Sequence, residues 1–206
     1  MPRRYAVTVS TPSASRPIAW SEGSWTTEPE AVEVAGDTLL VTAAEGSDAW
    51  RHTSYGFVHD TEHALLAPFA SGSAMEVEFG IPFSGQFDQA GLFVKVDAEH
   101  WVKAGIEFSD GRLQLGAVVT SGMSDWSLAP VPEWTGRRVT VRVSREGDAL
   151  TLRARADDEE FRLVRVIPFD PDAAASAGPF VCAPTRAGLT VPFSAWRQTD
   201  ADAALH

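Results

Sequence analysis

Residues 86–126 read QFDQAGLFVKVDAEHWVKAGIEFSDGRLQLGAVVTSGMSDW and contain three segments in which apolar and polar side chains alternate. The apolar positions include Leu92 and Val94 in the first segment. They include Ile106 in the second segment and Leu115 in the third. An apolar residue at every second position indicates a β-strand that buries one face. We therefore predict three consecutive antiparallel strands of one sheet.

The turn between the second and third strands sets their register. Asp110-Gly111 is a strong signal for a two-residue type I′ hairpin turn. A turn closed at this point places Phe108 opposite Leu113, and every other apolar residue of one strand then meets an apolar residue of the other. A slip of one residue would turn the strand over, so this agreement supports the register.

The hairpin before it contains both lysines of the chain. We expect Val96 to lie opposite Val102, with residues 98–100 as the loop. This register places Lys95 directly opposite Lys103. Like charges in that position destabilise a sheet, so another group must offset them.

The polar face of these strands combines charged, amide and aromatic side chains with glycines. Gly105 and Gly116 fall opposite each other on this face. Glycine inside a strand often marks a bend or a place where another group approaches the backbone. We interpret this face as the floor of a shallow bowl, and we expect Asp48 or Asp125 to supply the carboxylate that offsets Lys103.

Several short motifs along the chain carry a resemblance to one uncharacterised family. They are SDAWRHT at 47–53, FDQAGL at 87–92, WVKAGIE at 101–107, SDWS at 124–127 and FSAW at 193–196. With these motifs the chain resembles the regulation-of-enolase-type domain family of the concanavalin A-like lectin/glucanase superfamily. The resemblance covers residues 18–197 and implies an all-β fold, a two-sheet antiparallel jelly-roll sandwich. It implies no established activity.

Length and charge bound the class of protein. The chain has 206 residues, with 17 basic and 28 acidic side chains and a formal net charge of −11. This length suits one β-sandwich domain. The acidic balance argues against nucleic acid and against an anionic membrane surface as partners, because both require basic faces. It is compatible with a neutral sugar.

We divide the chain into an N-terminal arm at 1–17, a single β-sandwich domain at 18–197 and a disordered tail at 198–206. Cys182 is the only cysteine, so no internal disulfide can form. The residues after Arg3-Arg4 are too short and polar a run for a signal peptide, and no run approaches the roughly 20 apolar residues of a membrane span. We therefore predict a cytoplasmic protein.

Two further segments are interpreted as loops. His59 and His63 flank a predicted loop, and no matching ligands accompany them, so we expect neither a metal site nor a cofactor. Residues 121–136 are predicted to form a long loop that leaves the sheet near the bowl. Loops in this position often carry functional residues.

The bowl predicts a non-catalytic site for a small polar ligand, a carbohydrate or a similar metabolite. Aromatic platforms with a few placed polar groups are typical of such sites. The preference for sugar comes from the superfamily and is an analogy. The candidate ligand-binding residues are Trp50, His52, Gln89, Trp101, Lys103, Glu107, Asp125 and Trp126.

Two alternatives stay open. A carbohydrate-active enzyme of the glycosidase type would use Glu107 with a second carboxylate, Asp88 or Asp125. The Glu-x-Asp-x-Glu motif of laminarinase-type relatives is absent around Glu107, which favours a binding domain over an enzyme without deciding between them. The other alternative is a protein-interaction module that regulates a metabolic enzyme. The sequence predicts no particular oligomeric state.

Overall fold

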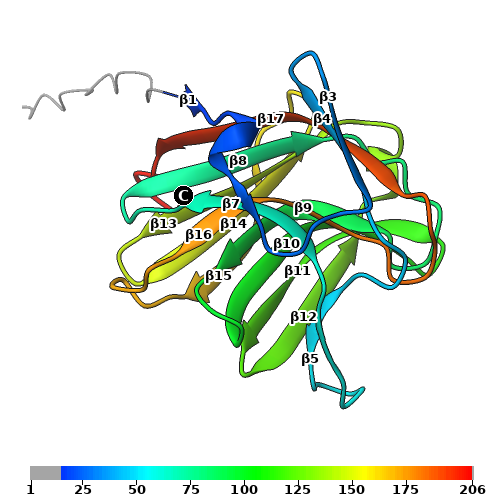
Figure 1. Ribbon diagram of the computed structural model, residues 1–206. Coiled ribbons are helices and arrows are strands. Elements are labelled where there is room, and N and C mark those ends of the chain that lie inside the picture. The colour runs from blue at the N-terminus through cyan, green and yellow to red at the C-terminus, as the bar shows by residue number, and fades with distance from the viewer. Residues whose placement is uncertain (1–14, 206) are drawn as a thin grey trace, which may run out of the picture.

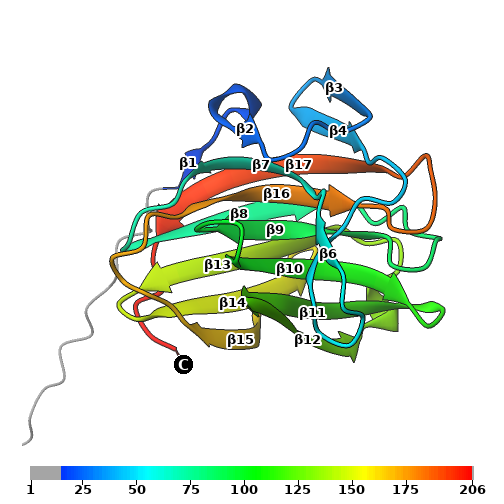
Figure 2. The same ribbon diagram turned by 60° about the horizontal axis from the view of Figure 1, so that its bottom comes forward.

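The computed structural model describes residues 15–205 and shows two antiparallel β-sheets stacked face to face (Figure 1 and Figure 2). One sheet has eight strands and the other has seven. Two stacked antiparallel sheets with a shared apolar core form a β-sandwich. The predicted all-β, two-sheet jelly-roll sandwich is therefore confirmed.

The eight-stranded sheet is called the back sheet. Its strands are, in spatial order, β15 (Arg162–Pro168), β14 (Ala149–Ala156), β13 (Val139–Glu146), β8 (Ser73–Phe79), β17 (Thr190–Asp200), β4 (Thr38–Thr42) and β3 (Ala31–Ala35). The short strand β1 (Arg16–Pro17) pairs with β17. The seven-stranded sheet is called the front sheet. Its strands are, in spatial order, β12 (Met123–Pro130), β11 (Arg112–Ser121), β10 (His100–Ser109), β9 (Gln89–Lys95), β16 (Ser176–Cys182), β7 (His63–Pro68) and β2 (Ser24–Trp25). A separate hairpin pairs β5 (Ala49–Arg51) with β6 (Val58–Asp60), and two short 3₁₀ turns are η1 (Trp20–Glu22) and η2 (Pro132–Trp134).

The core lies between the two sheets. Leu92, Ile106 and Leu115, which the alternation predicts to be apolar and inward, are all buried there. They belong to one cluster with Val77 and Val141 of the back sheet. The opposite side chains of β9, β10 and β11 consequently point away from the core, onto the outer face of the front sheet.

The β10–β11 hairpin has the predicted register. Phe108 lies opposite Leu113, and the pairing continues without interruption along both strands. Asp110 and Gly111 have φ angles of 52° and 74°. Both angles are positive, as a type I′ turn requires, which confirms the turn signal.

The predicted register of the β9–β10 hairpin is wrong by two residues. Val102 pairs with Val94, not with Val96, and Lys103 lies opposite Phe93. The two lysines are therefore not opposite each other. Lys95 instead forms its own ion pair with the Glu62 carboxylate, at 2.9 Å. A shift of two residues leaves every side chain on its predicted face.

The loop of that hairpin explains the shift. It contains residues 96–99, and Asp97 holds it closed: its Oδ1 atom accepts the backbone N–H groups of Glu99 and His100, each at 2.8 Å. A carboxylate that accepts backbone N–H groups two and three residues further on forms its own turn. This longer turn replaces the three-residue loop that the sequence suggests.

The segment 121–136 is mostly strand and not the predicted long loop. Gly122, with a φ of 73°, lets the chain reverse between Ser121 and Met123, and β12 then pairs with β11 along the edge of the front sheet. An edge strand exposes many of its side chains, so polar residues and prolines in this segment obscure its strand character.

The C-terminal residues up to 205, where the sequence suggests a tail, contact the back sheet. Strand β17 continues to Asp200. Beyond it, Asp202 forms ion pairs with Arg142 at 2.8 Å and Arg153 at 3.0 Å. At the other end, residues 1–14 of the predicted arm lie outside the described residues, whereas β1 pairs with β17.

Residues 15–205 contain neither a candidate membrane-spanning helix nor a candidate metal-binding cluster. In this part of the chain, no helix has the length and apolar character needed to cross a membrane. No group of three or more His, Cys, Asp or Glu side chains among the same residues is arranged to hold a metal ion. His63 is buried in β7, where its ring contacts the Thr27 carbonyl at 3.1 Å and accepts the Ala44 N–H.

Candidate functional site

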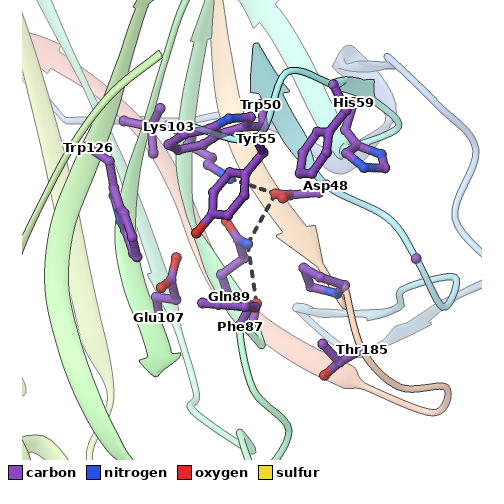
Figure 3. A pocket seen from close by; sticks show the side chains of 14 residues that line it. Asp48, Trp50, Tyr55, His59, Phe87, Gln89, Lys103, Glu107, Trp126 and Thr185 are labelled. Carbon is purple, nitrogen blue, oxygen red and sulfur yellow. Dashed lines mark hydrogen bonds and ion pairs between the residues drawn. The ribbon is translucent and has the colours of Figure 1, made fainter. Parts of the chain in front are cut away.

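The outer face of the front sheet carries a cavity of about 350 Å³. The β5–β6 hairpin covers it, and the floor comes from β9, β10 and β11 (Figure 2 and Figure 3). The residues that line it are Gly46, Asp48, Trp50, Tyr55, Phe57, His59, Phe87, Gln89, Lys103, Glu107, Val118, Trp126, Pro184 and Thr185.

A row of three glycines crosses the floor. Gly91, Gly105 and Gly116 are direct neighbours on β9, β10 and β11. A Cβ atom on Gly105 would collide with the Ala90 carbonyl and would lie 2.8 Å from the Gly91 Cα atom. Neighbouring backbone therefore comes so close to this row that only glycine fits there.

The same row opens a depression in the floor. Gly105 lies between Lys103 and Glu107 on one face of β10, so these two long side chains are not separated by a third. A smaller hollow of about 20 Å³ lies over Gly105 and Gly116 and shares Lys103 and Glu107 with the main cavity.

Lys103 ties the hairpin to the floor. Its Nζ atom lies 2.7 Å from the Asp48 carboxylate, at the point where the chain enters β5. Burial, the largest single effect, would lower the pKa of Lys103, but the charge and hydrogen bond of Asp48 together with other nearby groups, Glu107 among them, hold that pKa above its ordinary value. Of the two carboxylates that the sequence suggests as partners of Lys103, the structure uses Asp48.

Gln89 joins the same group from β9. Its amide nitrogen donates to the Asp48 carboxylate at 3.3 Å and to the Phe87 carbonyl at 3.2 Å, as Figure 3 shows. Asp48 thus receives hydrogen bonds from a cation and an amide. Charge-assisted bonds of this kind fix side-chain geometry.

Glu107 is the polar side chain of the floor that lacks a complete set of partners. Only 8% of the residue is exposed, and its Oε1 atom has no hydrogen-bond partner within residues 15–205. Burial raises the pKa of Glu107 to about 7; the positive charge of Lys103 opposes this rise and the negative charge of Asp48 adds to it. A buried polar atom without a partner is uncommon in folded proteins, which singles out Glu107 among the side chains of the floor.

Four aromatic side chains, called the aromatic wall, stand above the floor: Trp50, Tyr55, Phe57 and Trp126. Trp50 meets Trp126 edge to face, with ring centroids 6.1 Å apart and planes at 87°. Trp50 also meets Tyr55 at 5.7 Å and 65°, and Tyr55 stacks on Phe57 at 5.3 Å. Tyr55 is 59% exposed and Trp126 is 39% exposed, so the wall presents apolar surface to solvent.

Arg51 fixes the hairpin against the edge of the front sheet. Its backbone N–H donates to the Ser124 hydroxyl at 2.9 Å, and its guanidinium donates to the Gly122 carbonyl at 3.3 Å and to the Glu99 carboxylate at 2.8 Å. The position of the aromatic wall therefore depends on β12, which contributes Ser124.

The structure brings together five of the eight predicted site residues: Trp50, Gln89, Lys103, Glu107 and Trp126. The other three, His52, Trp101 and Asp125, do not line the cavity. His52 turns the hairpin, with a φ of 61° and an exposed side chain. Trp101 is buried and stacks on Phe93 at 5.4 Å, so it supports the floor from the side.

Asp125 points away from the cavity. It pairs with Arg165 of β15 at 2.9 Å, whereas the next residue, Trp126, faces the cavity. Neighbouring residues of a strand point to opposite faces, which a segment interpreted as a loop cannot reveal. Asp88, the other candidate for a second acid, is fully buried and binds Arg186 at 2.7 Å.

Sequence reasoning missed several lining residues, among them Tyr55, Phe57, His59, Phe87 and Thr185. The signal for two of them is the Tyr55-Gly56-Phe57 tripeptide, an aromatic pair around a glycine with a φ of 74°. Strands of three residues are too short to show a period, so the pattern does not predict the β5–β6 hairpin.

The comparisons with known proteins agree with this architecture. A family described as protein of unknown function (DUF1349) matches residues 25–201. This chain belongs to that family. A curated relative, "Regulation of enolase protein 1" of Saccharomyces cerevisiae, is 37% identical over 179 residues, which cover 87% of this chain and 90% of the relative. The resemblance that the motifs carry is confirmed.

Solved structures extend the likeness to the fold. The crystal structure of a functionally unknown protein from Saccharomyces cerevisiae has a TM-score of 0.83 and 36% identity, with 89% of this chain and 98% of that chain covered. The structure of xylan beta-1,4-xylosidase from Bacillus halodurans has a TM-score of 0.63 and 14% identity, with 95% of this chain and 41% of that chain covered. At this low identity the second likeness concerns the fold alone.

Proposed function

We propose that this protein is a non-catalytic binding domain that holds a carbohydrate or a similar polar metabolite in the cavity beneath the β5–β6 hairpin. The observation that carries the proposal is Glu107: a buried carboxyl oxygen without a partner faces a cavity bounded by an aromatic wall. A buried polar atom without a partner destabilises the free protein by about 1–3 kcal/mol, and a ligand donor would recover that energy.

The lining suits a ligand that is both polar and apolar. Aromatic rings pack against the C–H faces of a sugar or polyol, and a few fixed polar groups orient its hydroxyls. Lys103 offers a donor, because Asp48 uses only one of its three N–H groups, and Glu107 offers an acceptor. A volume of about 350 Å³ lies at the small end of ligand sites, which favours a compact metabolite over a long chain.

The proposal is tested by isothermal titration calorimetry with a panel of monosaccharides, disaccharides and linear polyols. We expect dissociation constants in the micromolar to millimolar range, about tenfold weaker for Trp126→Ala. Asp125→Asn is the matched control, because the neighbouring side chain lies on the other face of the strand. Silence across the whole panel, or binding that Trp126→Ala leaves unchanged, would overturn the proposal.

A second candidate function is hydrolysis, and one observation favours it. Asp48 and Glu107 line the same cavity, Asp48 is ion-paired with Lys103, and the pKa of Glu107 is raised by burial to about 7. A protonated carboxyl beside an ionised one is the arrangement of a general acid with a base or nucleophile. Release of nitrophenol from aryl glycosides, lost in Glu107→Gln and Asp48→Asn, would favour the enzyme over the binding domain.

A regulatory role is a third candidate, favoured by the name of the 37% identical yeast relative. The domain would then act on a metabolic enzyme such as enolase. Co-elution of the two proteins, or a change in enolase activity on mixing, would support this role. As part of the same proposal we place the protein in the cytoplasm, where the single buried thiol of Cys182 would stay reduced.

A further inference from the structure

We infer that the ligand of this cavity carries a protonated amine, which lies between Glu107 and the aromatic wall. The inference rests on the proposed function and names the chemical class of the ligand: a small amine-bearing polar compound of the amino-sugar or amino-polyol type. Charge, hydrogen bonding and ring geometry support it separately.

The first support is the charge of the cavity floor. Lys103 and Asp48 are paired at 2.7 Å and cancel each other. Glu107 has no cation of its own at hydrogen-bond distance, and Asp110 adds a second negative charge near it. His59 is another titratable side chain of the lining, and its ring packs edge to face on Phe57 with centroids 4.6 Å apart. When Glu107 is ionised, the floor therefore has one negative charge that no cation of the floor compensates.

The second support is the Oε1 atom of Glu107, which has no hydrogen-bond partner within residues 15–205. Oε1 of Glu107 needs a donor, and a sugar hydroxyl would supply one without compensating the charge. An ammonium group supplies both a donor and the opposite charge. Hydrogen bonds between charged groups are roughly twice as strong as those between neutral groups, and a buried charge is tolerated when it is paired.

The third support is the shape of the aromatic wall. Trp50 is nearly perpendicular to Trp126, at 87°, and is inclined to Tyr55 at 65°. Rings at such angles form a corner and not a flat platform. A flat platform suits the face of a sugar ring, whereas a corner of Trp and Tyr rings suits a compact cation, which the negative faces of the rings attract.

Figure 3 shows how the three supports meet. The Glu107 carboxylate rises from the floor between Trp126 and Gln89, below the Tyr55 ring. A cation held there contacts the carboxylate on one side and aromatic rings on the other. The remainder of the ligand reaches toward Gln89 and Lys103, where polar groups meet hydroxyls.

Proton release accompanies binding of this kind. The pKa of Glu107, raised by burial to about 7, leaves the side chain partly protonated near neutral pH. An ammonium group stabilises the ionised form, so binding expels that proton. The affinity should therefore rise from pH 6 to pH 7, and the binding enthalpy should depend on the ionisation enthalpy of the buffer.

The test compares three matched probes by calorimetry at pH 7: 2-amino-2-deoxyhexoses, their N-acetyl derivatives and the parent hexoses. We expect the free amines to bind about tenfold more tightly than either neutral probe, the factor that corresponds to one charge-assisted hydrogen bond. Glu107→Gln, which keeps the size of the side chain, should abolish this preference. Its thermal melting curve checks that the variant is folded, and the comparison of probes on the unaltered protein needs no variant.

The outcomes separate this inference from the function on which it rests. Neutral hexoses that bind as tightly as the amines would overturn the amine inference and leave the binding domain intact. Silence from all three probes would overturn the amine inference, whereas the binding domain falls only with silence across the whole panel of sugars and polyols. A preference for amines that survives in Glu107→Gln would assign the cation to another part of the cavity and would overturn the role of Glu107.

Discussion

At the scale of single residues, Glu107 is the most informative side chain of the protein. Period-two alternation places it on the outer face of β10 together with Lys103, and this can be predicted from the sequence. Its missing partner cannot be predicted, because that depends on which loop covers the strand. The same limit explains Asp125: it belongs to a strand that resembles a loop in sequence, and it faces the other way.

The pH dependence of stability tests the state of Glu107. Burial raises its pKa from 4.5 to about 7 in the folded protein. The folded state therefore holds a proton that the unfolded chain has lost, and the resulting stability is present below pH 4.5 and disappears as the pH rises through 7. The full difference is about 3 kcal/mol.

We expect Glu107→Gln to be more stable than the unaltered protein at pH 8, with a difference that shrinks toward pH 5. Urea unfolding at both pH values measures it. The other carboxylates titrate equally in both proteins, so their effect cancels. A stability difference that is the same at pH 5 and pH 8 would contradict the raised pKa.

At the scale of elements, the β5–β6 hairpin and the glycine row together make the cavity. The strands of the floor follow from alternation, and a register error of two residues does not change which side chains face the cavity. The hairpin above them does not follow from the sequence, because β5 and β6 are too short to show a period. The floor of the cavity can therefore be predicted from the sequence, whereas the hairpin that covers it cannot.

The Lys103–Asp48 ion pair should control the mobility of the hairpin. Lys103→Met removes the cation that holds the start of β5, so we expect faster hydrogen–deuterium exchange in residues 49–60 and a loss of stability of roughly 1–3 kcal/mol. Arg165→Met is the control, since it breaks the ion pair on the far face of β12. Equal exchange in residues 49–60 of both variants would show that the ion pair does not hold the hairpin.

The glycine row should tolerate no side chain. Gly105→Ala would place a Cβ atom against the Ala90 backbone, and we expect a loss of about 1–3 kcal/mol in urea unfolding. Gly80→Ala is the matched control, because its Cβ atom would meet only the Pro192 ring, at 3.0 Å. If the two variants lose the same stability, the close approach of the strands is not the reason for the glycines.

At the scale of the whole molecule, the two sheets and their core follow from many alternating segments, and the fold class was therefore predictable. The contacts of residues 201–205 were not. The segment after Asp200 is short and has no strand-like alternation, which suggests disorder, yet three of its interactions are ion pairs or hydrogen bonds with arginines that β13 and β14 present on the back sheet. Such long-range pairs leave no local signal.

Asp202 should therefore contribute to global stability. Among the described residues, Asp202→Ala leaves Arg153 without a carboxylate and Arg142 with only Glu76, and we expect a loss of about 1–3 kcal/mol in urea unfolding. Glu133→Ala, which breaks an exposed ion pair with Arg162, should cost less than about 1 kcal/mol. A variant at Asp202 as stable as the unaltered protein would restore the interpretation of this segment as a free tail.

The most direct test of the cavity as the binding site is a ¹H–¹⁵N NMR titration with the hexoses and 2-amino-2-deoxyhexoses. We predict saturable shifts of the backbone amides of Gln89, Lys103 and Glu107 and of the indole N–H of Trp126, with the back sheet unchanged. Saturable shifts confined to the back sheet, or none with any probe, would contradict the assignment of this cavity as a ligand site.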